Sequence, residues 1–308
     1  MRPLLIPLLA LLLLSCASTV QEVQVQTPAE LSGYEKEILE WQQARNDRLD
    51  QPDGWLTLSG LYWLNQGENS FGSAEGNDLV FPNDSAPAHM GVLMLEADSV
   101  SFSSHPGVEL TVGDSLLSRG GLRKDISGSP DILKWQSLSW YIIQRGERIG
   151  VRLKDSENPN YVNFKPTELF AIDSSWRIPA KLLPFDTTTT IDIVNVLGDT
   201  SPNPTPGILH FDIDGKNYEL TPIAEPGDDS YFIIFSDATS GVSTYGAGRF
   251  LVVPAADEQG ITIIDFNRSY NMPCVFSPYA TCPLPPPENM LKVAIEAGEL
   301  DYHLAGTH

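Results

Sequence analysis

The residues with the greatest capacity for chemistry are concentrated in one segment near the C-terminus, residues 265–289. An arginine guanidinium can hold a carboxylate or a phosphate through two parallel hydrogen bonds, so Arg268 predicts recognition of an anionic group. Prolines spread through the segment remove backbone donors and exclude a regular helix or a central strand, which predicts an irregular loop that presents its side chains. The candidate ligand-binding residues of this segment are Asp265, Asn267, Arg268, Asn271 and Glu288.

The carboxylates of the same segment could also bind a cation or act in acid–base catalysis. Asp265 and Glu288, joined by asparagine carbonyl oxygens, would supply the hard ligands that calcium or magnesium prefers. The two carboxylates would instead divide acid and base roles in a hydrolase if their environments pushed their pKa values apart. Either arrangement requires the two ends of the segment to lie close together. The alternative is structural, with Asp265 pairing with Arg268 to hold the loop while the asparagines cap turns.

A second block of candidates precedes this segment, and its members are Asp237, Tyr245 and Arg249. Asp237 follows a run that is typical of a buried strand, and Tyr245 lies in a glycine-rich turn. Glycines there allow backbone amides to approach a ligand, and Arg249 adds a positive charge. We predict that the two blocks join at one polar cleft. The competing interpretation is a hairpin whose glycines serve turn geometry alone.

Standard signatures of catalysis and cofactor binding are not found in the sequence. It has no His-Glu-x-x-His motif, no P-loop and no dinucleotide-binding fingerprint, and its five histidines are scattered. We therefore expect neither a histidine-rich zinc site nor a classical catalytic triad, we assign no metal ligands, and the sequence identifies no cofactor.

The two cysteines near the C-terminus predict a disulfide if the protein is exported. In an exported protein, Cys274 and Cys282 are most simply a disulfide pair, which would hold the ends of the proline-rich segment near each other. A redox pair or half of a metal site is the alternative.

The N-terminus is typical of a secretory signal. An apolar run over residues 4–14 follows one positive charge and is too short to span a bilayer comfortably, so residues 1–15 are predicted to be a signal peptide. The tetrapeptide Leu13-Leu14-Ser15-Cys16 resembles the lipobox of bacterial lipoproteins. That resemblance implies cleavage before Cys16 and attachment of diacylglycerol and an acyl chain to it, with an ordinary signal peptide as the alternative. Because no acidic residue follows Cys16 directly, we expect an exported lipoprotein of the cell envelope, anchored in the outer membrane and facing the periplasm.

Composition and charge limit the partners. The chain is 42% hydrophobic and 19% charged, which indicates a globular protein. Its net charge of −21 argues against nucleic acid or anionic lipid as a partner. The expected partners are the membrane, through the lipid anchor, and a small-molecule ligand.

The elements that would position these residues are mostly strands. Polar residues 16–33 read as the lipidated cysteine and a flexible tether, and good helix formers predict one helix over residues 34–50. After it come short apolar stretches separated by Gly, Pro, Asn and Asp, with no helix between them, which predicts antiparallel strands. The first series of predicted strands covers residues 55–61, 77–81, 91–96, 99–103, 108–112, 140–144 and 148–153. The second covers residues 176–181, 189–194, 207–213, 216–222, 231–235, 249–253, 261–265 and 291–295.

We therefore predict a mainly β protein with an antiparallel sandwich or barrel-like body and one N-terminal helix. Asp214-Gly215 between two alternating runs is a strong signal for a two-residue hairpin. A break near residues 165–175 suggests two β modules, residues 51–170 and 171–308. Within the first module, charged residues of one strand pair either contribute to the site or lie on a solvated face, and these are Arg148, Arg152 and Asp155.

Several sequence blocks resemble an uncharacterised bacterial and archaeal family, domain of unknown function 1684. They are Asp53-Gly54-Trp55-Leu56, Gly60-Leu61-Tyr62-Trp63-Leu64, Gly150-Val151-Arg152-Leu153-Lys154-Asp155, Phe235-Ser236-Asp237-Ala238-Thr239-Ser240-Gly241, Thr244-Tyr245-Gly246-Ala247-Gly248-Arg249-Phe250-Leu251 and residues 265–289. Met272 departs from the family pattern, which has Pro before the Pro-Cys pair. The family has no established activity, so the resemblance implies membership and leaves the function open.

A weaker resemblance, from Asn69 to His89, is to the forkhead-associated sandwich. Because Ser73 follows Gly72 where that family has its phosphate-holding Arg, phosphopeptide binding is not implied.

Two functions follow from these observations. The first is an exported lipoprotein whose polar cleft binds or hydrolyses a small anionic or polar molecule. The second is a non-catalytic envelope protein that docks a protein or glycan partner, with a purely structural loop. A flavin-binding barrel is compatible with the strand content, but no motif supports it.

Overall fold

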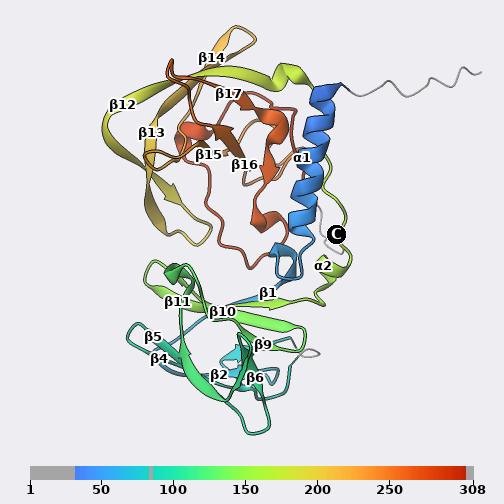
Figure 1. Cartoon of the computed structure of the whole chain (residues 1–308), viewed down its shortest axis with the longest axis vertical. Helices are drawn as coiled ribbons and strands as arrows, with labels where there is room; N and C mark the ends of the chain where they lie inside the picture. Colours follow the sequence, from blue (N-terminus) through green and yellow to red (C-terminus); the bar gives the residue numbers. More distant parts are fainter. Residues whose placement is uncertain (1–31, 83–85, 303–308) are drawn as a thin grey trace, which may run out of the picture.

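The computed structural model describes residues 32–82 and 86–302. The protein is mainly β, with two antiparallel β-sandwiches arranged along its long axis and helix α1 beside the second sandwich (Figure 1). The predicted signal peptide, Cys16 and nearly all of the tether lie outside the described residues. Within the described part of the chain, no helix has the length and apolar character that a membrane crossing requires.

The first sandwich consists of two sheets with the strand orders β1-β11-β10-β9-β6-β7 and β3-β2-β4-β5-β8. All of their pairs are antiparallel except β2 with β3. Alternating residues turn inward, and the rings of Phe71, Phe81 and Trp140 meet at the centre with centroids 5.5–5.7 Å apart. The strands are β1 (Leu58–Trp63), β2 (Gly67–Gly72), β3 (Leu79–Val80), β4 (Gly91–Glu96), β5 (Ser99–Ser104), β6 (Leu110–Val112), β7 (Ser115–Leu117), β8 (Arg119–Leu122), β9 (Leu133–Trp135), β10 (Leu138–Arg145) and β11 (Arg148–Asp155).

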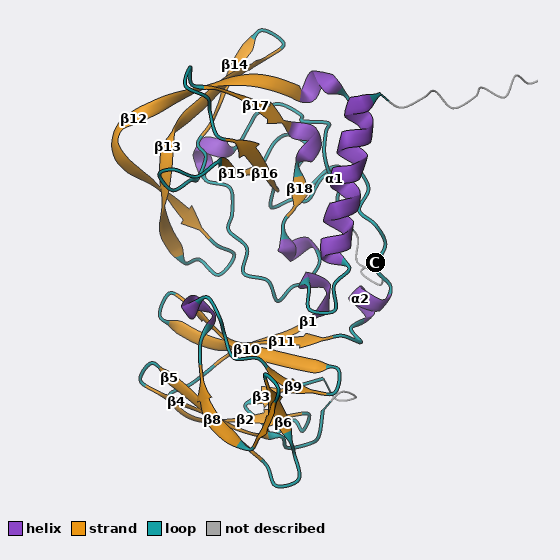
Figure 2. Ribbon diagram, in the orientation of Figure 1, coloured by secondary structure: helices purple, strands orange, loops and turns teal. Residues whose placement is uncertain are grey.

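The second sandwich packs a four-stranded sheet, β14-β13-β12-β17, against a three-stranded sheet, β15-β16-β18 (Figure 2). In its core, the centroid of the Phe266 ring lies 5.8 Å from that of Phe211 and 5.6 Å from that of Phe235. The strands are β12 (Arg177–Val194), β13 (Thr200–Ile213), β14 (Lys216–Leu220), β15 (Ser230–Phe235), β16 (Arg249–Pro254), β17 (Ile261–Asp265) and β18 (Tyr270–Asn271).

The long helix α1 (Gly33–Leu49) begins with a capping box, in which Ser32 Oγ accepts from the Glu35 backbone and the Glu35 carboxylate accepts from the Ser32 backbone. Its C-terminal half is tied to the chain near Thr167, because Gln42 donates to the Thr167 carbonyl at 2.7 Å. The other helices are short: α2 (Pro159–Val162) and the 310 helices η1 (Trp55–Thr57), η2 (Asp125–Ser127), η3 (Ser174–Trp176), η4 (Phe266–Arg268), η5 (Pro273–Val275) and η6 (Pro287–Asn289).

The predicted fold class is confirmed, including the single N-terminal helix. Strands 91–96 and 261–265 begin and end where the alternation predicts. Asp214 and Gly215 both have positive φ, 53° and 75°, as the predicted hairpin turn requires.

The structure differs from the predicted elements in several places. Residues 55–57 form a 310 turn before β1, and the strands predicted at residues 176–181 and 189–194 form one long strand, β12, which begins at Arg177. The predicted strand 291–295 is wrong, because a buried arginine takes the carbonyl of Ile295, which a strand partner would otherwise use. Strands β2, β7, β8 and β9 are too short or too polar to be predicted from alternation.

Candidate functional site

A groove with a volume of about 700 Å³ lies between α1 and the second sandwich. Four of its lining residues are arginines and three are acidic. It is lined by Glu37, Trp41, Arg45, Arg48, Arg177, Asp229, Ser230, Val252, Pro254, Ile263, Asp265, Arg268 and Tyr270.

Local periodicity explains why these residues meet. The lining residues of α1 are three or four positions apart, which places them on one face of the helix. On the strands, Val252 with Pro254 and Ile263 with Asp265 are two positions apart and therefore share a face of the sheet. The groove consequently combines an apolar floor with charged walls.

The four arginines of the groove are not equivalent. Arg268 forms ion pairs with Glu37 and with Asp265, and Arg45 forms one with buried Glu299. Arg48 and Arg177 are exposed, and their guanidinium groups have neither an ion pair nor a hydrogen bond to any described residue. Sequence reasoning missed both of them. For Arg48, the helical spacing of the lining residues was the available signal, whereas no local pattern marks Arg177.

Asp265 and Asn267 form a network that fastens α1 to the second sandwich. The Tyr34 hydroxyl donates to Asp265 Oδ1 at 2.7 Å, and Asn267 Nδ2 donates to the Tyr34 hydroxyl at 2.9 Å. Burial, and then the hydrogen bond to Asp265, raises the pKa of Tyr34. Asp265 also caps η4 by accepting from the Asn267 backbone. Asp265 and Arg268 therefore line the groove, while Asn267 is a buried structural residue.

The other two candidates of the segment lie elsewhere. Asn271 is fully buried, and its side chain donates to the Leu300 carbonyl at 2.7 Å. Glu288 is exposed in η6, which packs beside β14, at the opposite edge of the four-stranded sheet from β17 and Asp265. The expectation that the two ends of the segment meet is therefore wrong. Asp265 and Glu288 do not form a shared cation site or an acid–base pair, and the described residues include no cluster of three or more metal-ligating side chains.

The second block forms a buried ion pair in place of a ligand site. Arg249 Nη2 lies 2.7 Å from Asp237 Oδ2, with the two side chains 1% and 0% exposed. Arg249 also donates to the carbonyls of Ile295 and Ala297, so it holds the C-terminal segment against the sandwich. Burial lowers the pKa of Arg249, and the charge of Asp237 opposes that shift. Neither residue lines the groove.

Tyr245 is half-buried among apolar side chains away from the groove, and burial raises its pKa. The prediction that the two blocks join at one cleft is therefore wrong. The polar groups of the second block are used to close a turn and to anchor the segment that follows.

Replacing Arg249 by methionine is expected to lower the free energy of unfolding by about 3–5 kcal/mol, because Asp237 would stay buried without its countercharge. Urea unfolding followed by tryptophan fluorescence measures this loss. The matched control is Arg268→Met, whose ion pairs are more exposed and should be worth about 1 kcal/mol or less. Equal losses in the two variants would contradict the structural role of Arg249.

Glu299 is a further buried charge that sequence reasoning missed. Its side chain is fully buried, lies 3.3 Å from Arg45 Nε, and accepts from the Asn271 backbone at 2.7 Å and from the Thr167 hydroxyl at 3.1 Å. Burial raises the pKa of Glu299, and the charge of Arg45 opposes this shift.

The raised pKa predicts the pH dependence of stability. Because the folded state holds this proton more tightly than the unfolded state, the contribution of Glu299 is complete below its ordinary pKa of 4.5 and is lost as the pH rises through its folded-state pKa. The difference in free energy of unfolding between wild type and Glu299→Gln should therefore fall as the pH rises from about 4 to about 7. Urea titrations across this range measure the difference. A difference that rises with pH would show that Arg45 outweighs burial.

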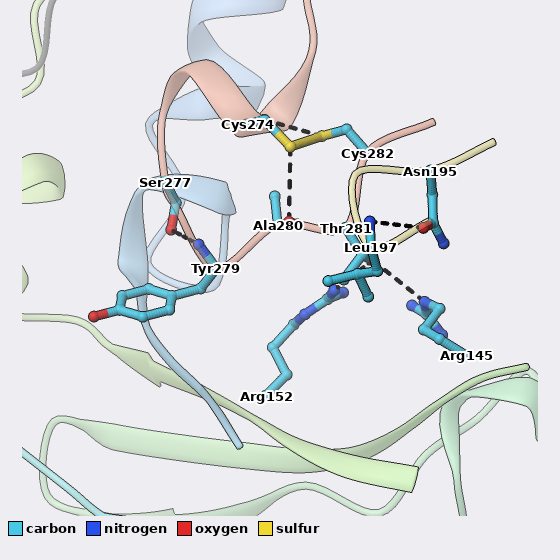
Figure 3. The surroundings of a disulfide bond; sticks show 10 residues. All are labelled: Arg145, Arg152, Asn195, Leu197, Cys274, Ser277, Tyr279, Ala280, Thr281 and Cys282. Carbon is cyan, nitrogen blue, oxygen red and sulfur yellow. Dashed lines mark hydrogen bonds between the residues drawn. A yellow bond between two sulfur atoms is a disulfide. The ribbon is translucent and has the colours of Figure 1, made fainter. Parts of the chain in front are cut away.

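The loop between η5 and η6 carries the predicted disulfide. Cys274 and Cys282 are bonded, with their Cα atoms 6.1 Å apart (Figure 3). The bond closes a short loop whose residues Tyr279 and Thr281 lie toward the first sandwich.

Comparisons with known proteins identify a family without an established activity. Residues 162–300 match the model of a family described as "Protein of unknown function (DUF1684)". No curated protein matches the chain.

Solved structures add little to this result. The solution NMR structure of an uncharacterized protein from Haloarcula marismortui is 27% identical, with a TM-score of 0.39, and the match covers 45% of this chain and 78% of that protein. Two FHA domains, one from work on phosphothreonine-dependent interactions and one in complex with an intracellular domain, are 10% identical with TM-scores of 0.22. Each FHA match covers 30% of this chain and at least 92% of the domain. Likenesses this low carry no argument about function.

Proposed function

We propose that the groove of this chain, whose residues 162–300 match the DUF1684 family of unknown function, binds a small anionic molecule with an apolar or aromatic body. The observation that carries the proposal is the pair Arg48 and Arg177. In a chain with a net charge of −21, two exposed guanidinium groups without a described counter-ion line the same groove. Guanidinium groups bind carboxylate and phosphate strongly, and an anion would supply the missing partner.

The remainder of the lining favours the rest of such a ligand. Trp41 and Tyr270 contribute aromatic surface, and Val252 and Ile263 contribute aliphatic surface. The volume of about 700 Å³ is in the usual range of small-molecule sites. The combination fits a molecule that carries one anionic group on an apolar body.

The proposal is one of binding. A hydrolase that divides acid and base roles between two carboxylates would need both of them free to exchange protons with its substrate. Of the three carboxylates that line the groove, Asp265 already accepts hydrogen bonds from Tyr34 and Asn267, and Glu37 is paired with Arg268, which leaves only the exposed Asp229. Asp265 and Glu37 hold the walls of the groove together.

The test uses benzoate as the anionic probe and benzamide as its neutral analogue, titrated by calorimetry. Wild type should bind benzoate in preference to benzamide. The double variant Arg48→Gln/Arg177→Gln should bind benzoate about tenfold more weakly, as expected for the loss of charge-assisted hydrogen bonds. Its stability should change by no more than about 0.5 kcal/mol, because both side chains are exposed and unpaired.

The matched control is Lys216→Gln/Lys292→Gln, which removes the same charge from exposed residues outside the groove. If this control weakens benzoate binding as much as the arginine variant does, the effect reflects net charge and the proposed site is wrong. The same conclusion follows if wild type does not distinguish benzoate from benzamide.

The proposal includes an exported lipoprotein anchored through Cys16 in the outer membrane. It is supported by the lipobox-like residues 13–16, by the short tether that ends where α1 begins, and by a disulfide, which suits an oxidising compartment.

Cell fractionation of the full chain tests the anchor. Wild type should partition with membranes and into a detergent phase, whereas Cys16→Ser should stay in the aqueous phase, because one lipidated residue carries all of the membrane affinity. Identical partitioning of the two chains would contradict lipidation at Cys16.

A further inference from the structure

Four cations share the face of the β10–β11 hairpin that turns toward the second sandwich. They are Arg145, Arg148, Arg152 and Lys154. On β11, Arg148, Arg152 and Lys154 are separated by four and two positions, so their side chains emerge on one side of the sheet. Three lie over aromatic rings: Arg148 over Trp63 at 4.8 Å, Arg152 over Trp55 at 5.6 Å, and Lys154 over Tyr141 at 5.5 Å. The face therefore gathers four cations although the chain as a whole is acidic.

Two of these four cations form ion pairs with carboxylates, and Lys154 donates to the backbone carbonyl of Asp53. Arg152 has no acidic partner among the described residues. Arg145 pairs with Asp125, and Arg148 pairs with Asp199. Arg152 is only 3% exposed, and its guanidinium donates a hydrogen bond from Nη2 to Thr281 Oγ1 at 3.1 Å and lies over the ring of Trp55. Its Nε–H is buried without any hydrogen-bond partner. A buried guanidinium without countercharge is costly, so this side chain requires an anion.

The hydroxyl of Thr281, like the Nε–H of Arg152, lacks a hydrogen-bond acceptor among the described residues. Its hydroxyl oxygen accepts from Arg152 Nη2 and also from Arg145 Nε at 3.4 Å (Figure 3). These two bonds occupy both lone pairs, so the hydroxyl can act toward a third group only as a donor. No described residue accepts its proton. Two donors, the Thr281 O–H and the Arg152 Nε–H, therefore belong to one cluster without acceptors.

The surroundings hold this cluster in place, and part of it reaches the surface. The disulfide at the neighbouring Cys282 closes the loop that carries Thr281. The Arg145 side chain is 28% exposed, and Thr281 is partly exposed. Burial lowers the pKa of Lys154, Asp53 opposes that shift, and the charge of Arg152 adds to it, which is consistent with a local excess of positive charge.

We infer that Arg152, Arg145 and Thr281 form an oxyanion-binding site between the two sandwiches, separate from the groove beside α1. An oxyanion offers only acceptors, so one carboxylate or phosphate group satisfies the Arg152 Nε–H and the Thr281 O–H and neutralises Arg152. Because Thr281 and Arg152 belong to different sandwiches, the bound group also strengthens the contact between them. This site does not depend on the proposed function of the groove.

The test titrates inorganic phosphate, and separately acetate, into the full chain, with chloride at matched ionic strength as the control. The readouts are the ¹⁵N–¹H signal of Arg152 Nε and the melting temperature. One or both oxyanions should move the Arg152 signal and raise the melting temperature beyond the effect of chloride. A response to phosphate alone identifies a phosphoryl ligand, and a response to acetate identifies a carboxylate.

Variants of Thr281 separate this site from the groove. Thr281→Val keeps the shape but removes the hydroxyl, and the apparent Kd of the effective anion should rise about tenfold. Thr281→Ser should restore binding, and Arg48→Gln/Arg177→Gln should leave the Arg152 signal responsive. The inference is overturned if neither anion moves that signal in wild type, or if Thr281→Val binds as tightly as Thr281→Ser.

Discussion

Arg45 fixes the C-terminal half of α1 against the second sandwich, as the Tyr34 network fixes its N-terminal end. Arg45 Nε lies 3.3 Å from the buried carboxylate of Glu299, its Nη2 donates to the Asn271 carbonyl at 2.9 Å, and its guanidinium lies 4.8 Å from the centre of the Tyr270 ring. Since a carboxylate buried without a cation is costly, Glu299 favours only placements of the helix that bring Arg45 to it. One face of α1 is thereby held opposite the strands, and the groove is the space that remains between them. A charge pair in the interior thus determines the shape of a surface feature.

Two groups of arginines in this acidic chain have different consequences. Arg45 and Arg249 are buried against carboxylates, and each also donates to backbone carbonyls of the C-terminal half, so they act as internal braces. Arg48, Arg177 and Arg152 have no acidic partner among the described residues. A protein with so many carboxylates has ample means to neutralise an arginine. Exposed Arg119 on β8 also lacks an acidic partner among the described residues. The unpaired arginines of the groove and the buried Arg152 are the more informative residues, because the first two share one groove and the third is nearly out of contact with solvent.

Sequence reasoning succeeded where the physics is local. Alternation predicted most strands, helix formers predicted α1, and the Asp214-Gly215 turn followed from backbone sterics. It failed for the site because polar residues in a loop are equally suited to binding a ligand and to satisfying the backbone. The side chains of Asn267 and Asn271 donate to backbone carbonyls, and this role is visible only from the hydrogen bonds in the structure. Arg177 joins the groove through the arrangement of the strands, and no local pattern in the sequence marks it.

The proline-rich segment, residues 265–289, nevertheless contributes to both candidate sites, the groove beside α1 and the cluster of Arg152, Arg145 and Thr281. Thr281 is not among the residues predicted from the sequence. The first residues of the segment, Asp265 and Arg268, form part of the groove wall, and its disulfide-closed part places Thr281 against Arg152 of the first sandwich. Prolines and a covalent bond restrict the conformations of this stretch in the unfolded chain as well as in the folded one, so less entropy is lost when it is held in place. A stiff connection of this kind can hold hydrogen-bonding groups at two distant surfaces without a strand or helix of its own. That property accounts for a long irregular segment whose polar side chains are nearly all engaged.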